Sequence, residues 1–367
     1  MRIVYLVTTL AMGGAERQAI TLASRMRERG HTVAFLVLRP RIAEQWATAL
    51  PVVYLDMCKT ASSVLYGFAK GRRFLREFRP DLMHSHTFHA NLLARLLKAA
   101  APVPVAISTV HNVYEGGWKR MLAYRLTDGL CRLTTAVSHA AARRYVRLRA
   151  VPERKCQVIS NGFDASVFAP SVERRTRTRE AMGAGEDFIW LAAGRIVAAK
   201  DYPNLLRAFA AVTASRARAR LWVAGAGELD EASDLIALGQ QLGVQEQVRW
   251  FGRWRDMPAL LDAADGFVLS SAWEGMPLAV GEAMAMEKPV VATDVGGVRE
   301  LVGDAGLLAP PMNSGELAKA MLDIMRMPQA NRHALGRAAR KRIQACFNMD
   351  AKAGEWARLY RAMTGKN

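Results

Sequence analysis

The sequence predicts an α/β protein with two Rossmann-like, doubly wound domains that face a cleft. Its 367 residues suggest two domains, at about 100 to 200 residues for each. Short apolar runs alternate with longer helical stretches, which is typical of parallel sheets covered by helices on both faces. The alternation stops at a polar, charge-rich stretch, 165–185, and then restarts. Two such series indicate two doubly wound domains.

The expected elements follow in chain order. The first series has expected strands at 3–7, 32–37, 52–55, 82–84, 103–108, 134–137 and 157–159, separated by helical stretches such as 14–29 and 89–99. The second series has expected strands at 188–193, 220–223, 248–251, 266–269 and 289–293. The stretch 165–185 between the two series is interpreted as a linker with a short helix.

We expect the domain boundary to follow residue 168, with domains at 1–168 and 169–347. Trp356, Leu359 and Tyr360 have close to helical spacing, so we expect 348–367 to form a helix that packs back on the first domain. Ligands of open α/β sheets bind outside the carboxyl ends of the strands, so residues that follow strands are candidates for a site.

The composition excludes several classes of protein. Hydrophobic residues make up 51% of the chain, too many for a mainly disordered protein. No stretch approaches the roughly 18 consecutive apolar residues of a membrane-spanning helix. The four cysteines lie far apart, without metal-ligand spacing. We therefore expect a reduced, soluble protein of the cytoplasm.

The net charge of +18 is distributed unevenly along the chain. Residues 1–170 carry 25 basic and 10 acidic residues, a net +15, whereas 171–367 carry 26 and 23, a net +3. This asymmetry indicates a polyanionic partner, either nucleic acid, an acidic membrane surface or an anionic substrate. A high-GC genome would explain abundant arginine but not a one-sided net charge.

The most informative stretch, 270–302, begins where the expected strand 266–269 ends. Glu274 and Glu282 are separated by seven residues. Pro277 suits the first position of a helix, because its missing N–H would be unpaired there, and the free amides of that helix start favour a phosphate. Two carboxylates at different depths can reach different hydroxyls of one elongated ligand. Taken alone, the two glutamates would more commonly be interpreted as a solvated loop carboxylate and a carboxylate on a helix face.

Two further pairs follow expected strands. Arg195 and Lys200, after 188–193, can bind a diphosphate as a planar fork and a point charge, although an isolated pair of this kind is more often a pair of solvated surface cations. Gly13 and Gly14 follow the first strand, where backbone without Cβ permits close approach of a diphosphate at a helix start, or simply forms a turn. Their spacing is not G-x-G-x-x-G, so we expect no nicotinamide or flavin cofactor.

Histidines follow two more strands. His111 follows 103–108, and its ordinary pKa of about 6.5 suits proton handling. A polar core histidine at a strand end is the alternative. His84, His86 and His89 have spacing that zinc can use, but no carboxylate or cysteine nearby supports them, so we expect no metal site.

Together these motifs resemble the retaining glycosyltransferases of family 4, also called glycosyl transferases group 1, which have the two-domain GT-B fold. The stretch 270–302 resembles their E-x7-E signature, and three other segments resemble their glycine loop, the turn before the linker and an Arg–Lys block: 8–18 (TTLAMGGAERQ), 160–168 (SNGFDASVF) and 193–209 (AGRIVAAKDYPNLLRAF). The resemblance spans almost the whole chain. It departs at Asp201, where glycine is commoner, and at Met276, where Phe or Leu is frequent.

The resemblance implies a catalytic set of four residues. His111 would face the anomeric centre and orient the donor sugar or its phosphate. Glu274 would hold hydroxyls of the transferred sugar. Arg195 and Lys200 would bind the diphosphate and stabilise the charge that develops on the leaving phosphate.

The resemblance also implies a set of substrate-binding residues. Glu282 would accept the ribose hydroxyls of a nucleoside-diphosphate sugar bound on the second domain, and the first domain would receive the acceptor. The other expected contacts with substrate are Gly13, Gly14, Gly275, Met276, Pro277 and Leu278. No D-x-D pair is present, which favours a metal-independent transferase without a cofactor.

Two basic segments suggest a membrane surface as partner. The segment 62–80 can form an amphipathic helix, with Val64, Leu65, Phe68, Leu75 and Phe78 on one face and cations opposite. A second basic run contains Arg143, Arg144, Arg147 and Arg149. Such helices can bind anionic bilayers, where each cation adds about 1 kcal/mol. An ordinary packing helix with a solvated cationic face is the alternative.

The predicted activity is retaining transfer of a hexosyl or N-acetylhexosaminyl group from a UDP sugar to a glycan or polyprenyl-diphosphate acceptor. The expected setting is bacterial surface-polysaccharide synthesis, with the protein peripheral at the inner face of the cell membrane. A nucleotide-sugar epimerase of the same fold is the main alternative. A phosphorylase would need a Schiff-base lysine and pyridoxal phosphate. A nucleic-acid binder is suggested by charge alone, since no binding motif accompanies it.

Overall fold

The computed structural model describes residues 1–43, 45–215, 218–227 and 229–366, which form two compact units. Unit 1 comprises Met1–Gly162 and the described residues from Met349 onward, and unit 2 comprises Phe163–Asn348. The sequence suggested a boundary after residue 168. In the structure Phe163 packs against Phe347 and lies over Gly281, so the contacts group 163–168 with unit 2.

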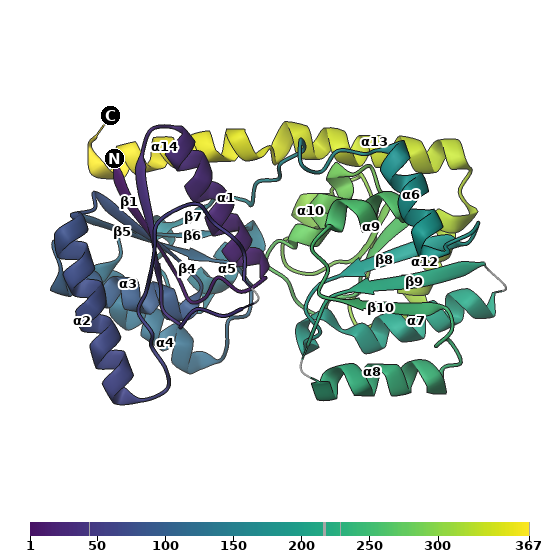
Figure 1. The fold of residues 1–367 in the computed structure, drawn as a ribbon, viewed down its shortest axis with the longest axis horizontal. Helices are drawn as coiled ribbons and strands as arrows, with labels where there is room; N and C mark the ends of the chain where they lie inside the picture. The colour runs from purple at the N-terminus through teal and green to yellow at the C-terminus, as the bar shows by residue number, and fades with distance from the viewer. Residues whose placement is uncertain (44, 216–217, 228, 367) are drawn as a thin grey trace. The chain divides into compact units, whose positions relative to one another are not determined.

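Unit 1 contains a seven-stranded parallel sheet with strand order β3-β2-β1-β4-β5-β6-β7 (Figure 1). Its strands are β1 (Arg2–Val7), β2 (Thr32–Val37), β3 (Val52–Tyr54), β4 (Leu82–His86), β5 (Val105–Val110), β6 (Leu133–Ala136) and β7 (Cys156–Val158). The chain first adds strands on one side of β1 and then returns to add β4 on the other, so the strand order reverses between β1 and β4.

Helices cover both faces of this sheet. They are α1 (Gly14–Glu28), α2 (Ala61–Phe78), α3 (Phe88–Ala100), α4 (Trp118–Thr127), α5 (His139–Arg147) and α14 (Met349–Thr364). The apolar sides of α1 and α14 pack on the β1 side chains Ile3, Tyr5 and Val7, whereas α2 and α3 pack on Val4 and Leu6. In α14, Tyr360 also donates to or accepts from Tyr5 at 3.1 Å. Alternating β1 side chains therefore feed two separate cores.

Unit 2 contains a six-stranded parallel sheet with strand order β10-β9-β8-β11-β12-β13. The strands are β8 (Phe188–Ala193), β9 (Ala219–Ala224), β10 (Val248–Gly252), β11 (Gly266–Leu269), β12 (Val290–Thr293) and β13 (Leu307–Ala309). The helices are α6 (Val172–Met182), α7 (Tyr202–Ala214), α8 (Leu229–Gln241), α9 (Met257–Ala263), α10 (Leu278–Ala285), α11 (Val298–Val302), α12 (Ser314–Arg326) and α13 (Gln329–Cys346). The predicted fold class, two doubly wound parallel α/β domains, is confirmed. Within the described residues, no helix is both long and apolar enough to cross a membrane.

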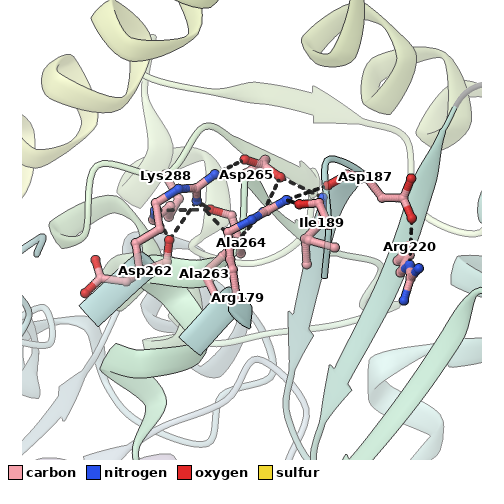
Figure 2. Close-up of polar contacts among 11 residues, drawn as sticks. Arg179, Asp187, Ile189, Arg220, Asp262, Ala263, Ala264, Asp265 and Lys288 are labelled. Carbon is pink, nitrogen blue, oxygen red and sulfur yellow. Dashed lines mark hydrogen bonds and ion pairs between the residues drawn. The ribbon is translucent and has the colours of Figure 1, made fainter. Parts of the chain in front are cut away.

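The charge-rich segment at the start of unit 2 contains helix α6, which hydrogen bonds and ion pairs attach to the rest of the unit. Helix α6 directs three guanidinium groups at the carboxyl end of α9 and at the start of β11, and Figure 2 shows part of this network. Arg175 and Arg179 bind the two oxygens of Asp265 at 2.5 and 3.1 Å. The same carboxylate accepts the backbone N–H of Ile189 at 2.8 Å. Cations near a helix carboxyl end are favourable, so α6 is fastened to the sheet by charge.

Lys288 belongs to the same network and is half-buried. Its ammonium donates to the carbonyl oxygens of Asp262 and Ala264 at 3.1 Å each. Burial, with the neighbouring Arg175 as a second cause, lowers the pKa of Lys288 to about 8. The folded protein therefore releases this proton far more readily than an unfolded chain does.

This difference predicts a pH-dependent contribution to stability. From about pH 8 up to the ordinary lysine pKa of 10.5, the unfolded chain binds more protons than the folded chain, so stability rises with pH. Lys288→Met lacks the titrating group. We therefore expect the free energy of unfolding of wild type, minus that of Lys288→Met, to rise by up to about 3 kcal/mol over this interval. Denaturant titrations at a series of pH values measure it. A difference independent of pH would show that Lys288 keeps its proton in the folded state.

Candidate active site

The order of strands reverses once in each sheet, and polar loops gather at both reversals. Between adjacent strands whose connections leave in opposite directions, the loops part and leave room for a ligand at the carboxyl edge. In unit 2 these strands are β8, which is followed by Arg195 and Lys200, and β11, which is followed by Glu274. In unit 1 they are β1, followed by Gly13, and β4, followed by the histidine-rich segment.

Lys200 and Glu274 form a close ion pair at the unit 2 reversal. The Lys200 Nζ lies 2.5 Å from Glu274 Oε1, and the same oxygen accepts the hydroxyl of Ser271 at 2.7 Å. Glu274 is buried, and Lys200 is largely covered. The structure thus brings together a predicted sugar-binding carboxylate and a predicted phosphate-binding cation, from loops 74 residues apart in sequence.

Hydrogen bonds to backbone carbonyls hold these two loops together. The Ser270 hydroxyl donates to the Lys200 carbonyl at 2.8 Å, and Ala272 N–H donates to the Ala199 carbonyl at 2.9 Å. Thr293, at the end of β12, donates from its hydroxyl to the Ser271 carbonyl at 2.7 Å. The loops that carry the ion pair are therefore held at the carboxyl ends of three neighbouring strands, β8, β11 and β12.

Asp201 explains why glycine suits the position after Lys200. Its backbone adopts the left-handed conformation, with φ of 47°, which L-residues other than Asn and Asp rarely tolerate. Asp201 is also the N-cap of α7, since its carboxylate accepts the N–H of Asn204 at 3.3 Å. Asp in place of the commoner glycine therefore costs backbone strain at this position but provides a cap for α7.

The E-x7-E stretch surrounds the start of α10. Pro277, expected as the first helical residue, lies at the N-cap, and the helix begins at Leu278. The first amides of an α-helix have no carbonyl partner within the helix, so the start of α10 can offer N–H groups to a ligand. Glu282 lies on the second turn of α10 and is buried. The two predicted carboxylates therefore belong to different parts of the same loop–helix unit.

Other predicted residues of unit 2 surround this loop. The Gly275 carbonyl accepts the N–H of Gly297 at 2.8 Å, which ties the loop to the glycine turn after β12, and Met276 is buried. Arg195 follows Gly194 and is exposed. A Cβ on Gly225 would lie 1.8 Å from the Gly194 carbonyl oxygen, so only glycine allows the ends of β8 and β9 to approach this closely.

The reversal in unit 1 is lined by a chain of histidines. His86 Nδ1 lies 2.9 Å from His111 Nε2, so one imidazole donates to the other. Burial lowers the pKa of His111 to about 4, so His111 is neutral at physiological pH. Both rings line a small cavity with Gln18, Asn161 and Lys352. His86 Nε2 is buried and finds no hydrogen-bond partner among the described residues.

The neighbouring His84 is held in the core of unit 1 by hydrogen bonds. Its two ring nitrogens bind the Tyr360 hydroxyl and the Thr109 hydroxyl at 2.6 Å each. Both positions that a metal ion would use are thus engaged. Across the parts of the chain that the structure describes, no three His, Cys, Asp or Glu side chains are arranged to hold a metal ion.

The glycine pair in unit 1 is positioned as expected, but its helix start has a competitor for anions. Gly13 is the N-cap of α1 and Gly14 its first residue. A Cβ on Gly13 would lie 2.3 Å from Oε2 of Glu16, because that carboxylate folds back over the glycine. A carboxylate at a helix start is favourable, so an anionic ligand here requires Glu16 to turn away.

Sequence reasoning did not identify several groups at these sites. Ser271 shares Glu274 Oε1 with Lys200, and Glu115 receives the N–H of His111 at 3.4 Å and the Tyr124 hydroxyl at 3.0 Å. The position of Ser271, three residues before Glu274, was the only available signal. Nothing in the spacing of Glu115 and Tyr124 indicates their contact, which depends on how α4 packs.

The fold and these two loop clusters define a glycosyltransferase of GT-B type. The family models described as Glycosyltransferase Family 4 and Glycosyl transferases group 1 match residues 12–167 and 174–342. The chain belongs to this family of glycosyltransferases, as its motifs indicated.

Individual relatives are distant. The chain is 27% identical over 247 residues to the UDP-Gal:alpha-D-GlcNAc-diphosphoundecaprenol alpha-1,3-galactosyltransferase of Escherichia coli, covering 63% of this chain and 62% of that enzyme. It is 25% identical over 322 residues to the alpha-D-kanosaminyltransferase of Streptomyces kanamyceticus, covering 82% of each. The Anabaena protein HepE, solved in complex with UDP-glucose, superposes with a TM-score of 0.87 at 22% identity, covering 99% of this chain and all of that one. This last likeness shows a shared fold.

The left-handed backbone and the capping carboxylate of Asp201 affect the stability of the protein in opposite ways. Asp201→Ala loses the cap and keeps the strained φ, so we expect the free energy of unfolding to fall by about 1–2 kcal/mol. Asp201→Gly loses the cap but relieves the strain, so we expect a change within about 0.5 kcal/mol. Chemical denaturation measures both.

Asp256 is a matched control, because it also caps a helix with proline in its first turn but has φ of −88°. There we expect glycine to have a smaller advantage over alanine, the one that an unstrained N-cap position gives. Equal advantages of glycine at the two positions would contradict the role assigned to backbone strain at Asp201.

Proposed function

We propose that the protein transfers a hexosyl or N-acetylhexosaminyl group, with retention of configuration and without a metal ion, from a UDP sugar to a glycan or polyprenyl-diphosphate acceptor. The observation that carries the proposal is the Lys200–Glu274 pair at the strand-order reversal of unit 2. It combines a cation suited to phosphate with a buried carboxylate suited to hydroxyl groups.

In this proposal unit 2 binds the donor. Lys200 and Arg195 bind the diphosphate as a point charge and a planar fork. Glu274 accepts hydroxyls of the transferred sugar, and Glu282 accepts those of the ribose. The remaining donor contacts come from Gly275, Met276, Pro277 and Leu278 around the start of α10, because backbone N–H groups at a helix start suit phosphate oxygens. Pro277 itself has no N–H to donate.

The proposed chemistry places charge stabilisation before acid–base catalysis. The acceptor oxygen forms a bond to the anomeric carbon on the face from which the phosphate leaves, and the departing phosphate oxygen takes the proton of the acceptor hydroxyl. Lys200 and Arg195 stabilise the negative charge on that phosphate. His111, being neutral, orients the sugar as a hydrogen-bond partner, and His86 holds its imidazole. Gly13 and Gly14 lie on the acceptor side.

The acceptor and the setting are proposed from the relatives and from charge. The Escherichia coli relative is named for an acceptor on diphosphoundecaprenol. Unit 1 carries 29 basic and 11 acidic residues, a net +18, whereas unit 2 carries 22 of each. A cationic acceptor domain suits a lipid diphosphate at the inner face of a bacterial cell membrane, in surface-polysaccharide synthesis.

Substitutions of the ion pair test the donor site. Glu274→Gln keeps the shape and hydrogen bonds of the side chain but loses its charge, and Lys200→Gln loses the cation at the diphosphate. We expect each to lower kcat for transfer by about 100-fold or more, as with removal of one transition-state contact. Release of UDP with sugar donors and a polyprenyl-diphosphate acceptor measures the rate.

Glu246→Gln and Lys319→Gln are matched controls, since both residues are exposed in unit 2. Thermal unfolding checks that all four variants are folded. Full activity in both ion-pair variants would overturn the assignment of the site.

The stereochemistry and the metal requirement are tested with wild type. We expect the product of an α-linked donor to be α-linked, and the rate to be unchanged in excess EDTA, because two cationic side chains serve the leaving diphosphate. The anomeric proton coupling in the NMR spectrum of the product distinguishes the configurations. A β-linked product would refute retention, and a rate that EDTA abolishes would refute metal independence.

A further inference from the structure

The outer face of α4 is apolar although it faces solvent. Trp118, Leu122 and Leu126 are 70%, 41% and 76% exposed. They lie at positions i, i+4 and i+8, so they form one stripe along the helix. Single exposed apolar residues are ordinary, but a contiguous row of three large ones marks an interaction surface.

The inner face of α4 is held firmly, so this stripe cannot turn inward. Tyr124, on the inner face, donates its hydroxyl to Glu115 and accepts from the Asn91 amide at 2.9 Å. The buried guanidinium of Arg95 donates to the Tyr124 carbonyl at 2.9 Å and to the Thr127 hydroxyl at 3.1 Å. Figure 1 shows α4 beside α3, which carries both Asn91 and Arg95.

Cations surround the stripe, and no acidic residue belongs to either helix that bears them. Lys119 and Arg125 are exposed on α4 itself, with the Lys119 ammonium 5.9 Å from the centre of the Trp118 ring. Arg144 of α5 lies over the ring of Tyr114, just before α4, at 5.7 Å. The exposed Arg143 and Arg147 continue this positive surface along α5.

We infer that the α4 stripe and the α5 cations form a surface that docks on an anionic lipid bilayer. Trp118, Leu122 and Leu126 insert at the level of the acyl boundary, and the cations bind headgroup phosphates. The charge of the molecule selects this occupant, because unit 1 carries the whole excess of +18 and unit 2 is neutral. Apolar insertion and cationic attraction together supply the two signals that stable anchoring needs.

The docking surface adjoins the acceptor side of unit 1. His111 directly follows β5, and only the loop 112–117 separates it from α4. Within this loop, Glu115 binds both the His111 amide and the Tyr124 hydroxyl. A bilayer against α4 therefore lies next to the histidine loop, where a lipid-linked diphosphate would emerge. This part of the inference rests on the proposed function.

The surface differs from the one that sequence patterning suggested. Within 62–80, Leu75 is fully buried, and Phe68 and Phe78 pack on the same core cluster. Val64 and Leu65 instead lie exposed at the amino end of α2, next to the exposed Tyr66. Most of the expected apolar face thus stabilises unit 1, and the apolar anchor lies on α4.

Vesicle sedimentation tests the inference. The probes are vesicles of phosphatidylcholine alone and of phosphatidylcholine with about a third phosphatidylglycerol. We expect wild type to bind the anionic vesicles, Leu122→Ser/Leu126→Ser to bind about tenfold more weakly, and Arg143→Gln/Arg147→Gln to lose the preference for anionic lipid. The control Val172→Ser/Met312→Ser removes two apolar side chains of unit 2 that are 83% and 74% exposed, and it should bind as wild type.

Two outcomes would overturn the inference. One is equal vesicle binding by wild type and the stripe variant, or none by wild type. The other is a wild-type dimer in size-exclusion chromatography that becomes monomeric in the stripe variant, since a second copy of the chain would then cover α4.

UDP release with a water-soluble acceptor analogue separates this inference from the proposed function, because the stripe variant should keep the wild-type rate with that acceptor. Absence of transfer by wild type, with vesicle binding intact, would refute the proposed function alone.

Discussion

In a parallel sheet each connection returns over one face from the carboxyl end of a strand to the amino end of the next. Where the chain changes the side on which it adds strands, two neighbouring loops leave in opposite directions and the backbone parts. Both sheets contain one such reversal, between β1 and β4 and between β8 and β11. The ion pair of Lys200 with Glu274 lies at the second, and the pairing of His86 with His111 lies beside the first. The groups proposed to bind the donor and to orient its sugar therefore lie at these two places.

The two units handle charge in opposite ways. Unit 2 is neutral overall and uses ion pairs internally, as in the attachment of α6 to Asp265 and the pairing of Lys200 with Glu274. Unit 1 keeps its excess of cations on the surface, and its buried Arg95 is satisfied by hydroxyl and carbonyl oxygens. A neutral unit suits a site that selects its ligand through a few placed groups. A cationic unit suits attraction to an extended anionic surface.

Much of the fold and of the loop between β11 and α10 could be predicted, because both are local in sequence. Buried parallel strands are short apolar runs, and residues that follow them lie at one edge whatever the tertiary detail. The prediction failed where packing decides. The three-residue strand β13 has too little pattern to recognise, and β-sheet pairing alone makes it a strand. The exposure of Leu65 and the burial of Leu75 depend on how α2 rotates against the sheet, which periodicity leaves open.

The sequence by itself determined the family, the two-series architecture, the pair Glu274 and Glu282 and the uneven charge, because each is a matter of residue type and spacing. Only the tertiary structure decided that Lys200 reaches Glu274, that His86 holds His111, and that α4 turns an apolar stripe outward. These facts arise from contacts between residues far apart in the chain. Such contacts depend on strand order and helix rotation, and no local pattern encodes either of them.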